Sequence, residues 1–213
     1  MKNRGIFITF EGCEGCGKTT HSKAIKKYLV DKGFDVVLTH EPGSTTLGKQ
    51  IRKILLSEKS VLSPNAELLL FAADRAQHVD SVIMPGLAEG KIVICDRYID
   101  STVAYQIGGR GLPEDMVRYL NAISSKGLIP DLTIFLDVNP EVGIKRVVKS
   151  SGKRDRFEME KIAFHEKVRG AYLNIYKEDP GRVVVINSEK EIKTVQTEIR
   201  SAVDKLLDSR RSL

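Results

Sequence analysis

The stretch Gly12-Cys13-Glu14-Gly15-Cys16-Gly17-Lys18-Thr19-Thr20 fits the pattern G-x-x-x-x-G-K-[ST], which is typical of a phosphate-binding P-loop. Glycines let the backbone N–H groups point inward around an anion, and the positive N-terminal end of the next helix faces the same phosphates. We expect Lys18 to reach the β- and γ-phosphates of ATP and the Thr19 hydroxyl to ligate Mg²⁺. All nine residues are therefore predicted to bind ATP, with Mg²⁺ as cofactor.

The sequence on either side of this loop supports the same interpretation. Residues 6–10 predict a buried strand that enters the loop, and residues 21–32 predict a helix that leaves it, with apolar side chains at helical spacing. A chance glycine-rich turn is the alternative. The strand before the loop and the helix after it favour the P-loop.

Apolar runs and turn residues predict further strands at 34–39, 92–95, 132–138 and 182–186. Helices are predicted at 46–57, 64–87, 101–107, 113–125, 140–149, 157–176 and 192–207. Strands that alternate with helices imply an α/β fold, a parallel sheet with helices on both faces. The sequence shows neither an internal repeat nor an interdomain linker, so we expect residues 1–213 to form a single domain.

Composition narrows the class of protein. The chain of 213 residues has a net charge of +6, and its basic residues are spread along the sequence. This distribution suits anionic small molecules and argues against a nucleic-acid surface, which needs a clustered basic face. No apolar run approaches the ~18 residues of a membrane span, and no secretory signal is visible, so we expect no membrane partner.

The cysteines are few and odd in number, which indicates a reducing compartment and a cytoplasmic protein. They are Cys13, Cys16 and Cys95. Cys13 and Cys16 form a C-x-x-C that could be redox-active or half of a metal site. Because both occupy variable positions of the P-loop and no second pair exists, small loop fillers are the favoured interpretation.

Asp96 and Arg97 follow the strand predicted at 92–95, at the sheet edge where open α/β folds bind ligands. Asp96 suits Mg²⁺, directly or through water, together with Thr19. The planar fork of Arg97 suits a phosphate, and a surface ion pair is the alternative.

Two pairs of side chains lie one helical turn apart and could surround a base. Phe71 and Arg75 could stack on a ring and bond its edge, although a core phenylalanine with a snorkelling arginine is the simpler interpretation. Thr102 and Gln106, with Tyr105 between them, could contact a base edge or merely decorate a helix.

Residues 149–157 are polar and basic and predict a short mobile lid over a transferring phosphate. Its cations are Lys149, Lys153, Arg154 and Arg156. A solvated loop is the alternative. We expect Arg154 and Arg156, with Lys18 and Arg97, to act in catalysis.

Several motifs together resemble the thymidylate kinase family in its bacterial form. They are the P-loop stretch from Phe10 to Thr20, Glu41-Pro42-Gly43, Leu70-Phe71-Ala72-Ala73-Asp74-Arg75, Asp96-Arg97-Tyr98-Ile99-Asp100-Ser101, Ala104-Tyr105-Gln106, Gly109-Arg110-Gly111 and Pro130-Asp131-Leu132-Thr133. The resemblance covers nearly the whole chain. The chain departs from bacterial members at His40 and Gly152, where they carry arginine, and at Ser44, where many carry a second glycine.

The resemblance implies a P-loop NTPase fold with a five-stranded parallel core, a homodimer, and transfer of the γ-phosphoryl group of ATP to dTMP. It places Phe71 against thymine, Arg75, Thr102 and Gln106 at the base edge, and Tyr105 beside the 2′ position. Arg52 and Arg97 would hold the acceptor phosphate. Glu14, Glu41 and Ser101 complete the expected dTMP-binding set. The alternatives are a kinase for another nucleoside monophosphate and a non-catalytic nucleotide-binding module.

Overall fold

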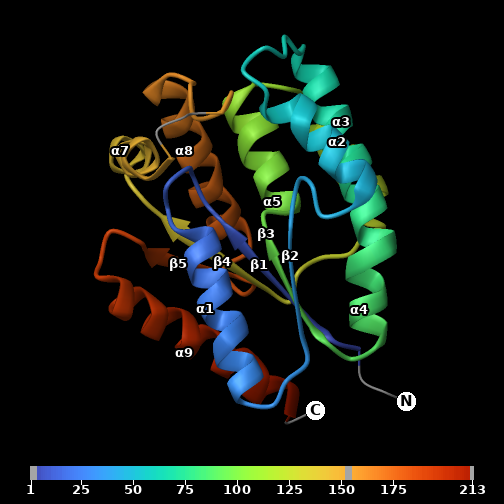
Figure 1. Cartoon of the computed structure of the whole chain (residues 1–213), viewed down its shortest axis with the longest axis vertical. Coiled ribbons are helices and arrows are strands. Elements are labelled where there is room, and N and C mark those ends of the chain that lie inside the picture. Colours follow the sequence, from blue (N-terminus) through green and yellow to red (C-terminus); the bar gives the residue numbers. More distant parts are fainter. Residues whose placement is uncertain (1–3, 152–154, 212–213) are drawn as a thin grey trace.

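The computed structural model describes residues 4–151 and 155–211. Within these residues, one parallel sheet of five strands has the order β2-β3-β1-β4-β5 (Figure 1). The strands are β1 (Ile6–Glu11), β2 (Val36–His40), β3 (Ile92–Asp96), β4 (Leu132–Asp137) and β5 (Val183–Asn187). Helices surround the sheet, as the sequence predicts.

Most predicted helices are present, with ends shifted by a few residues. They are α1 (Lys18–Asp31), α2 (Thr46–Leu56), α3 (Pro64–His78), α4 (Met84–Ala88), α5 (Ile99–Thr102), α6 (Glu114–Ser125), α7 (Pro140–Ser151), α8 (Ile162–Glu178) and α9 (Ile192–Arg211). Ser63 caps α3, because its side chain accepts a hydrogen bond from the Ala66 N–H. Two π-helical segments, η1 (Val79–Ile83) and η2 (Val103–Gly109), continue α3 into α4 and α5 toward α6.

The two faces of the sheet bury alternate side chains of the same strands. On β1, Ile8 and Phe10 belong to the core cluster that includes α1, α8 and α9, whereas Phe7 packs with η1 and α4. On β3, Ile94 and Val93 divide in the same way. This two-residue period places a layer of helices on each side, as a doubly covered parallel sheet requires.

Two predictions about local structure were wrong. Residues 157–161 are not helical, because the Asp155 carboxylate accepts hydrogen bonds from the N–H groups of Phe157 and Glu158 and holds a turn. The helix predicted at 101–107 does not stop before Gly108 and Gly109; both glycines lie in η2, which they let pack closely on α8. A Cβ on Gly109 would stand 2.5 Å from the Phe164 ring.

The predicted lid at 149–157 lies partly outside the described residues, because Gly152, Lys153 and Arg154 fall there. Among the described helices, none is long and apolar enough to cross a membrane. The P-loop follows β1, Glu41 follows β2, and Asp96 ends β3. Parallel strands bring these residues to one edge of the sheet.

Candidate active site

A cavity of about 600 Å³ opens at this carboxyl edge. Its walls come from the P-loop, the ends of β2 and β3, and the facing sides of α2, α3, α5 and η2. Of the residues selected from the sequence, the following line it: Glu14, Gly15, Lys18, Thr19, Glu41, Arg52, Phe71, Arg75, Asp96, Arg97, Ser101, Thr102, Tyr105 and Gln106. The fold therefore brings the complete expected dTMP-binding set to one cavity.

The P-loop has the backbone shape that its glycines predict. Gly12, Gly15 and Gly17 all have positive φ, at 139°, 69° and 93°. The Lys18 ammonium lies across the loop and donates to the carbonyl oxygens of Gly12 and Cys13, each at 3.0 Å. A cation is thus held at the mouth of an anion-binding loop.

The side chains of Cys13 and Cys16 point into the core. Both residues are buried, and burial raises the pKa of both thiols. A thiol that stays protonated is a poor nucleophile, so these two residues fit the interpretation as loop fillers. Gly12, Gly17 and Thr20 also belong to the loop without lining the cavity.

Arg97 is the most heavily bonded cation of the site. Its backbone has a φ of 71°, and its Nη2 donates to Glu14 at 2.6 Å and to the Tyr105 hydroxyl at 3.1 Å. Its Nη1 donates to the Gly12 carbonyl at 3.1 Å. Burial favours the neutral form of Glu14, but the charges of Arg97 and Lys18 outweigh it and lower the pKa of this carboxyl. Glu14 is therefore an ionised anchor for Arg97.

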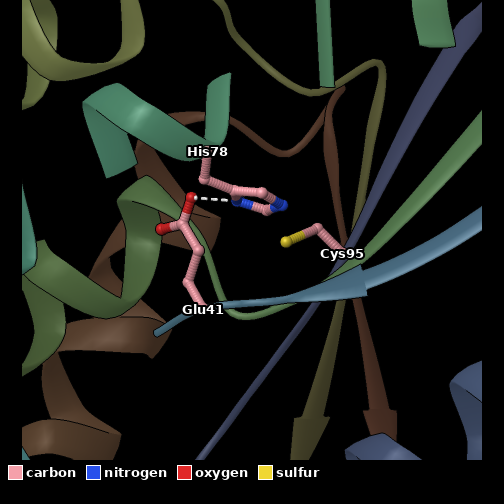
Figure 2. Close-up of side chains that lie close together, drawn as sticks. All are labelled: Glu41, His78 and Cys95. Carbon is pink, nitrogen blue, oxygen red and sulfur yellow. Dashed lines mark hydrogen bonds and ion pairs between the residues drawn. The ribbon is translucent and has the colours of Figure 1, made fainter. Parts of the chain in front are cut away.

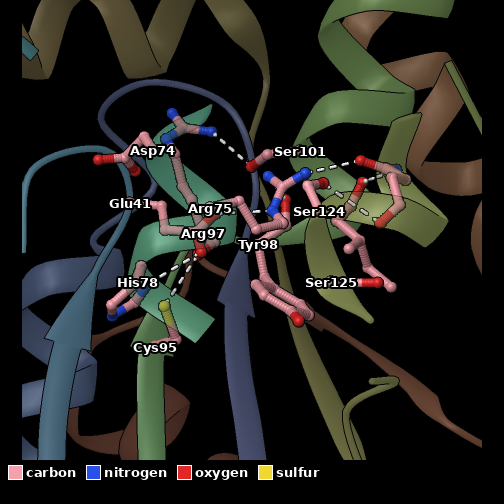
Figure 3. Close-up of polar contacts among 12 residues, drawn as sticks. Glu41, Asp74, Arg75, His78, Cys95, Arg97, Tyr98, Ser101, Ser124 and Ser125 are labelled. Carbon is pink, nitrogen blue, oxygen red and sulfur yellow. Dashed lines mark hydrogen bonds and ion pairs between the residues drawn. The ribbon is translucent and has the colours of Figure 1, made fainter. Parts of the chain in front are cut away.

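Arg75 also lines the cavity and is almost completely buried; Figure 3 shows the polar side chains around it. Its Nε donates to Glu41 at 2.8 Å, its Nη1 to Asn121 at 2.6 Å, and its Nη2 to the Tyr98 carbonyl at 3.1 Å. A guanidinium has five N–H groups. One N–H on each Nη therefore has no hydrogen-bond partner among the described residues and is free for a ligand.

Aromatic side chains also line the cavity. The ring of Phe71 lies 5.9 Å from that of Phe157, and the ring of Tyr105 lies 5.7 Å from the same Phe157 ring. Gln106 lines the cavity, and its Nε2 donates to Glu67 at 2.8 Å. Flat apolar surfaces beside a few polar groups suit a nucleobase.

The family model for thymidylate kinase matches residues 10–199. The chain belongs to the thymidylate kinase family. It is 47% identical over 206 residues to the thymidylate kinase of Geotalea daltonii, covering 93% of this chain and 96% of that one. It is 45% identical over 208 residues to that of Gloeobacter violaceus, covering 97% and 98%. The crystal structure of thymidylate kinase from Ehrlichia chaffeensis aligns with a TM-score of 0.78 at 35% identity, covering 94% of this chain and 99% of that one.

These comparisons confirm the resemblance, the P-loop fold and the class of enzyme that the sequence predicts, a kinase. They do not test the assignment of individual residues, so each role stays a prediction. The fold explains why these residues meet. The P-loop, Glu41 and Asp96 lie at the carboxyl ends of neighbouring strands, and α2, α3, α5 and η2 place the other selected residues around the same cavity.

One buried cluster has the composition of a metal site. The ligand atoms of Glu41, His78 and Cys95 lie within 4.8 Å of one another (Figure 2). However, His78 bonds Glu41 through Nδ1 at 2.9 Å and Thr39 through Nε2 at 2.6 Å, and the Cys95 thiol lies 3.0 Å from the Arg97 carbonyl. Both imidazole nitrogens are engaged, so the cluster fits a network that holds Glu41 against Arg75.

Of the four predicted lid cations, Arg154 and Arg156 are the two expected to act in catalysis. Arg154 lies outside the described residues. Arg156 is described, but it does not line the cavity. Its Nη1 lies 2.6 Å from Glu67, and its Nε donates to the Leu55 carbonyl at 2.9 Å. The structure therefore does not bring the Arg156 guanidinium to the phosphate end of the cavity.

Sequence reasoning missed several participants. Phe157, Asp155 and Glu158 line the cavity from the segment after α7. The sequence predicted a helix from residue 157 onward and therefore no turn at this point. Glu67 was missed although a signal was available: it is a lone carboxylate beside Leu68 at the start of an apolar helix. A carboxylate buried in an apolar helix needs hydrogen-bonding partners, so Glu67 could have been expected to bind polar side chains near the site.

Proposed function

We propose that the chain transfers the γ-phosphoryl group of ATP to dTMP, giving ADP and dTDP for dTTP biosynthesis. One observation supports this proposal above others. A P-loop and the complete set of expected dTMP-binding residues line the same cavity, in a chain of the thymidylate kinase family. Phosphoryl transfer requires such a shared cavity, because donor and acceptor must meet in line.

At the donor end, Lys18 would turn from the P-loop carbonyls to the β- and γ-phosphates, whose full charges attract an ammonium more strongly. The donor set beside it suits Mg²⁺, since the Thr19 hydroxyl donates to Asp96 Oδ2 at 2.7 Å and both residues line the cavity. Thr19 and Asp96 would hold the ion, which when bound neutralises charge on the phosphates.

At the acceptor end, Arg97 and Arg52 would hold the phosphate of dTMP. Arg97 Nη1 shares its N–H groups among weak, neutral acceptors, including the Ser101 hydroxyl at 3.3 Å. A charged phosphate oxygen would replace them. Arg52 is exposed and reaches the Pro42 carbonyl at 2.7 Å, which fixes its guanidinium at the rim.

At the base end, Phe71 would stack on thymine, and the free N–H groups of Arg75 would donate to a carbonyl oxygen such as O4. Thr102 and Gln106 would meet the rest of the base edge. Tyr105 is held by Glu14 through a 2.6 Å hydrogen bond and would crowd the 2′ position. Glu41 would act indirectly, by orienting Arg75.

The test is phosphate transfer from ATP across a panel of nucleoside monophosphates. We expect dTMP to be the best acceptor, dUMP to follow closely because only a methyl group is missing, and dCMP to fall well behind. Lys18→Ala, which removes the phosphate-directed charge, should abolish transfer to every acceptor. Preference for another monophosphate would support the first alternative, and ATP binding without transfer would support a non-catalytic module.

We further propose a homodimer, a single domain over residues 1–213 and a cytoplasmic location. The homodimer rests on exposed apolar side chains on α2, α3 and α6. The single domain rests on one continuous sheet. The cytoplasmic location rests on the few cysteines, all of which are free thiols.

A further inference from the structure

Glu67 on α3 is a buried carboxylate that joins three elements. Its side chain is only 1% exposed. It accepts from Gln106 Nε2 at 2.8 Å, from Arg110 Nε at 3.0 Å and Nη2 at 3.1 Å, and it lies 2.6 Å from Arg156 Nη1. It does not line the cavity itself. Its contacts therefore act on the site only through the groups it holds.

The chemistry of Glu67 decides which way the Gln106 amide points. The Glu67 carboxylate faces N–H donors of two guanidinium groups, and toward them and toward Gln106 it acts as a hydrogen-bond acceptor. Gln106 must then turn its NH₂ end toward Glu67. Its Oε1 accepts no hydrogen bond from the described residues, and Gln106 is part of the cavity wall.

We propose that Glu67 sets the base preference of the acceptor site by locking the Gln106 amide so that its oxygen faces the base. This inference rests on the proposed function. Thymine carries a donor, N3–H, where cytosine carries an acceptor, N3. A locked acceptor matches thymine and opposes cytosine, whereas a freely rotating amide would suit both. Glu67 is thus a positioning residue for specificity.

Arg110 and Arg156 both contact the Glu67 carboxylate. Arg110 donates to both oxygens of the Glu67 carboxylate and Arg156 lies against one of them, so the carboxylate is held in place beside the Gln106 amide. Arg110 also donates to Glu160 at 2.5 Å, on the rim of the cluster. Among the described residues, Glu160 makes no hydrogen bond to Gln106 and so provides a matched control.

The experiment compares kcat/KM for dTMP and for dCMP in wild type, Glu67→Gln and Glu160→Gln. The Glu67→Gln amide can donate as well as accept, so it no longer dictates the direction of Gln106. We expect the ratio of dTMP to dCMP efficiency to fall on the order of tenfold in Glu67→Gln, from mispairing of a buried group. The ratio should be unchanged in Glu160→Gln.

A merely structural role would lower both efficiencies together and leave their ratio unchanged. The pathway through Gln106 is tested in a Gln106→Leu background, where adding Glu67→Gln should no longer change the ratio. If Glu67→Gln fails to fold because two arginines face a neutral amide, Glu67→Gln with Arg110→Gln preserves the charge balance. The same fall in ratio is expected there.

The outcomes separate the two proposals. A wild-type chain that prefers dTMP, with an unchanged ratio in a folded Glu67 variant, would overturn this inference alone. A further fall when Glu67→Gln is added to Gln106→Leu would also overturn it. A wild-type chain that transfers no phosphate to dTMP would overturn the proposed function and this inference with it.

Discussion

The guanidinium of Arg97 is fixed before any ligand arrives. Its contacts to Glu14 and Gly12 in the P-loop and to Tyr105 in η2 come from two different segments, so the plane of the fork is set by the fold. Arg97→Lys would keep the charge but lose the planar geometry. We expect kcat/KM for dTMP to fall about 10- to 100-fold, since a hydrogen bond to a charged group contributes ~1.5–3 kcal/mol.

The measurement is steady-state kinetics with each substrate varied in turn. KM for dTMP should rise and kcat should fall, while KM for ATP changes little. Arg118→Lys is the control, because Arg118 is an exposed residue paired with Glu114 on α6, outside the cavity. A variant in which only ATP binding weakens would refute the assignment of Arg97 to the acceptor phosphate.

Glu11 gives a prediction about pH. It is fully buried at the end of β1 and accepts from the Tyr98 N–H at 2.7 Å, Ser101 at 2.5 Å and Tyr172 at 2.9 Å. Burial, assisted by the charge of Asp100, raises the pKa of Glu11 from 4.5 to about 7. Between these values the native state holds a proton that the unfolded state has lost. The contribution of Glu11 to stability is therefore complete below pH 4.5 and disappears as pH rises to about 7.

Glu11→Gln removes this titration while preserving the shape of the side chain. The check is urea unfolding from pH 5 to pH 8. The free energy of unfolding of wild type, minus that of the variant, should decrease by up to about 1.4 kcal/mol per pH unit below pH 7 and then level off. Parallel curves for the two proteins would show that Glu11 is ionised throughout.

At the residue scale, the sequence predicts which side chains meet but not how they pair. Spacing offered Phe71, Arg75, Thr102 and Gln106 as candidates, the family resemblance assigned them to the base, and all four line the cavity. The pairing of Arg156 with Glu67 could not be predicted, because an arginine side chain reaches many acceptors and tertiary packing decides among them. Such pairing distinguishes a residue that touches substrate from one that supports it.

At the scale of elements, α7 crosses the P-loop at a contact between two glycines. A Cβ on Gly143 would stand 2.2 Å from the Glu14 carbonyl oxygen, and one on Gly15 would stand 2.0 Å from the Gly143 carbonyl oxygen. Backbone atoms leave no room for rearrangement. Gly143→Ala should therefore displace the P-loop and destabilise the chain by about 1–3 kcal/mol, despite the better helix propensity of alanine.

Chemical unfolding and ATP titration test this expectation, with weaker ATP binding as the second readout. Gly170→Ala is the matched control, since nothing lies within 4 Å of a Cβ at that position in α8. There the substitution should stabilise the chain by about 0.5–1 kcal/mol. If both variants were equally stable and bound ATP equally well, the close crossing of α7 and the P-loop would be refuted.

The elements themselves follow from the sequence wherever apolar periodicity is strong. All five strands and the long helices were predicted, because burial on one face fixes their period. The segments η1 and η2 and the turn at Asp155 were not. A π-helical turn has no distinct apolar period, and the turn depends on one carboxylate competing for backbone N–H groups.

At the scale of the whole molecule, apolar side chains remain exposed on one group of neighbouring helices. They are Leu47 and Ile54 on α2, Leu69 on α3, and Tyr119 and Ile123 on α6. Helix α3 contacts both α2 and α6, and α2 and α3 lie side by side in Figure 1. Leu68 and Ile83 are buried within the subunit, whereas Leu69 is exposed. The exposed set supports the prediction of a homodimer.

We expect sedimentation at micromolar concentration to give twice the chain mass of 23.7 kDa. Leu69→Glu, which places a charge in the centre of these helices, should shift the population toward monomer, because a charge buried without a partner is costly. Ile192→Glu is the control: Ile192 is equally exposed, but it begins α9, which packs on α1, β4 and β5. A wild-type monomer would contradict the homodimer. A dimer that persists in Leu69→Glu and dissociates in Ile192→Glu would instead place the interface at the start of α9.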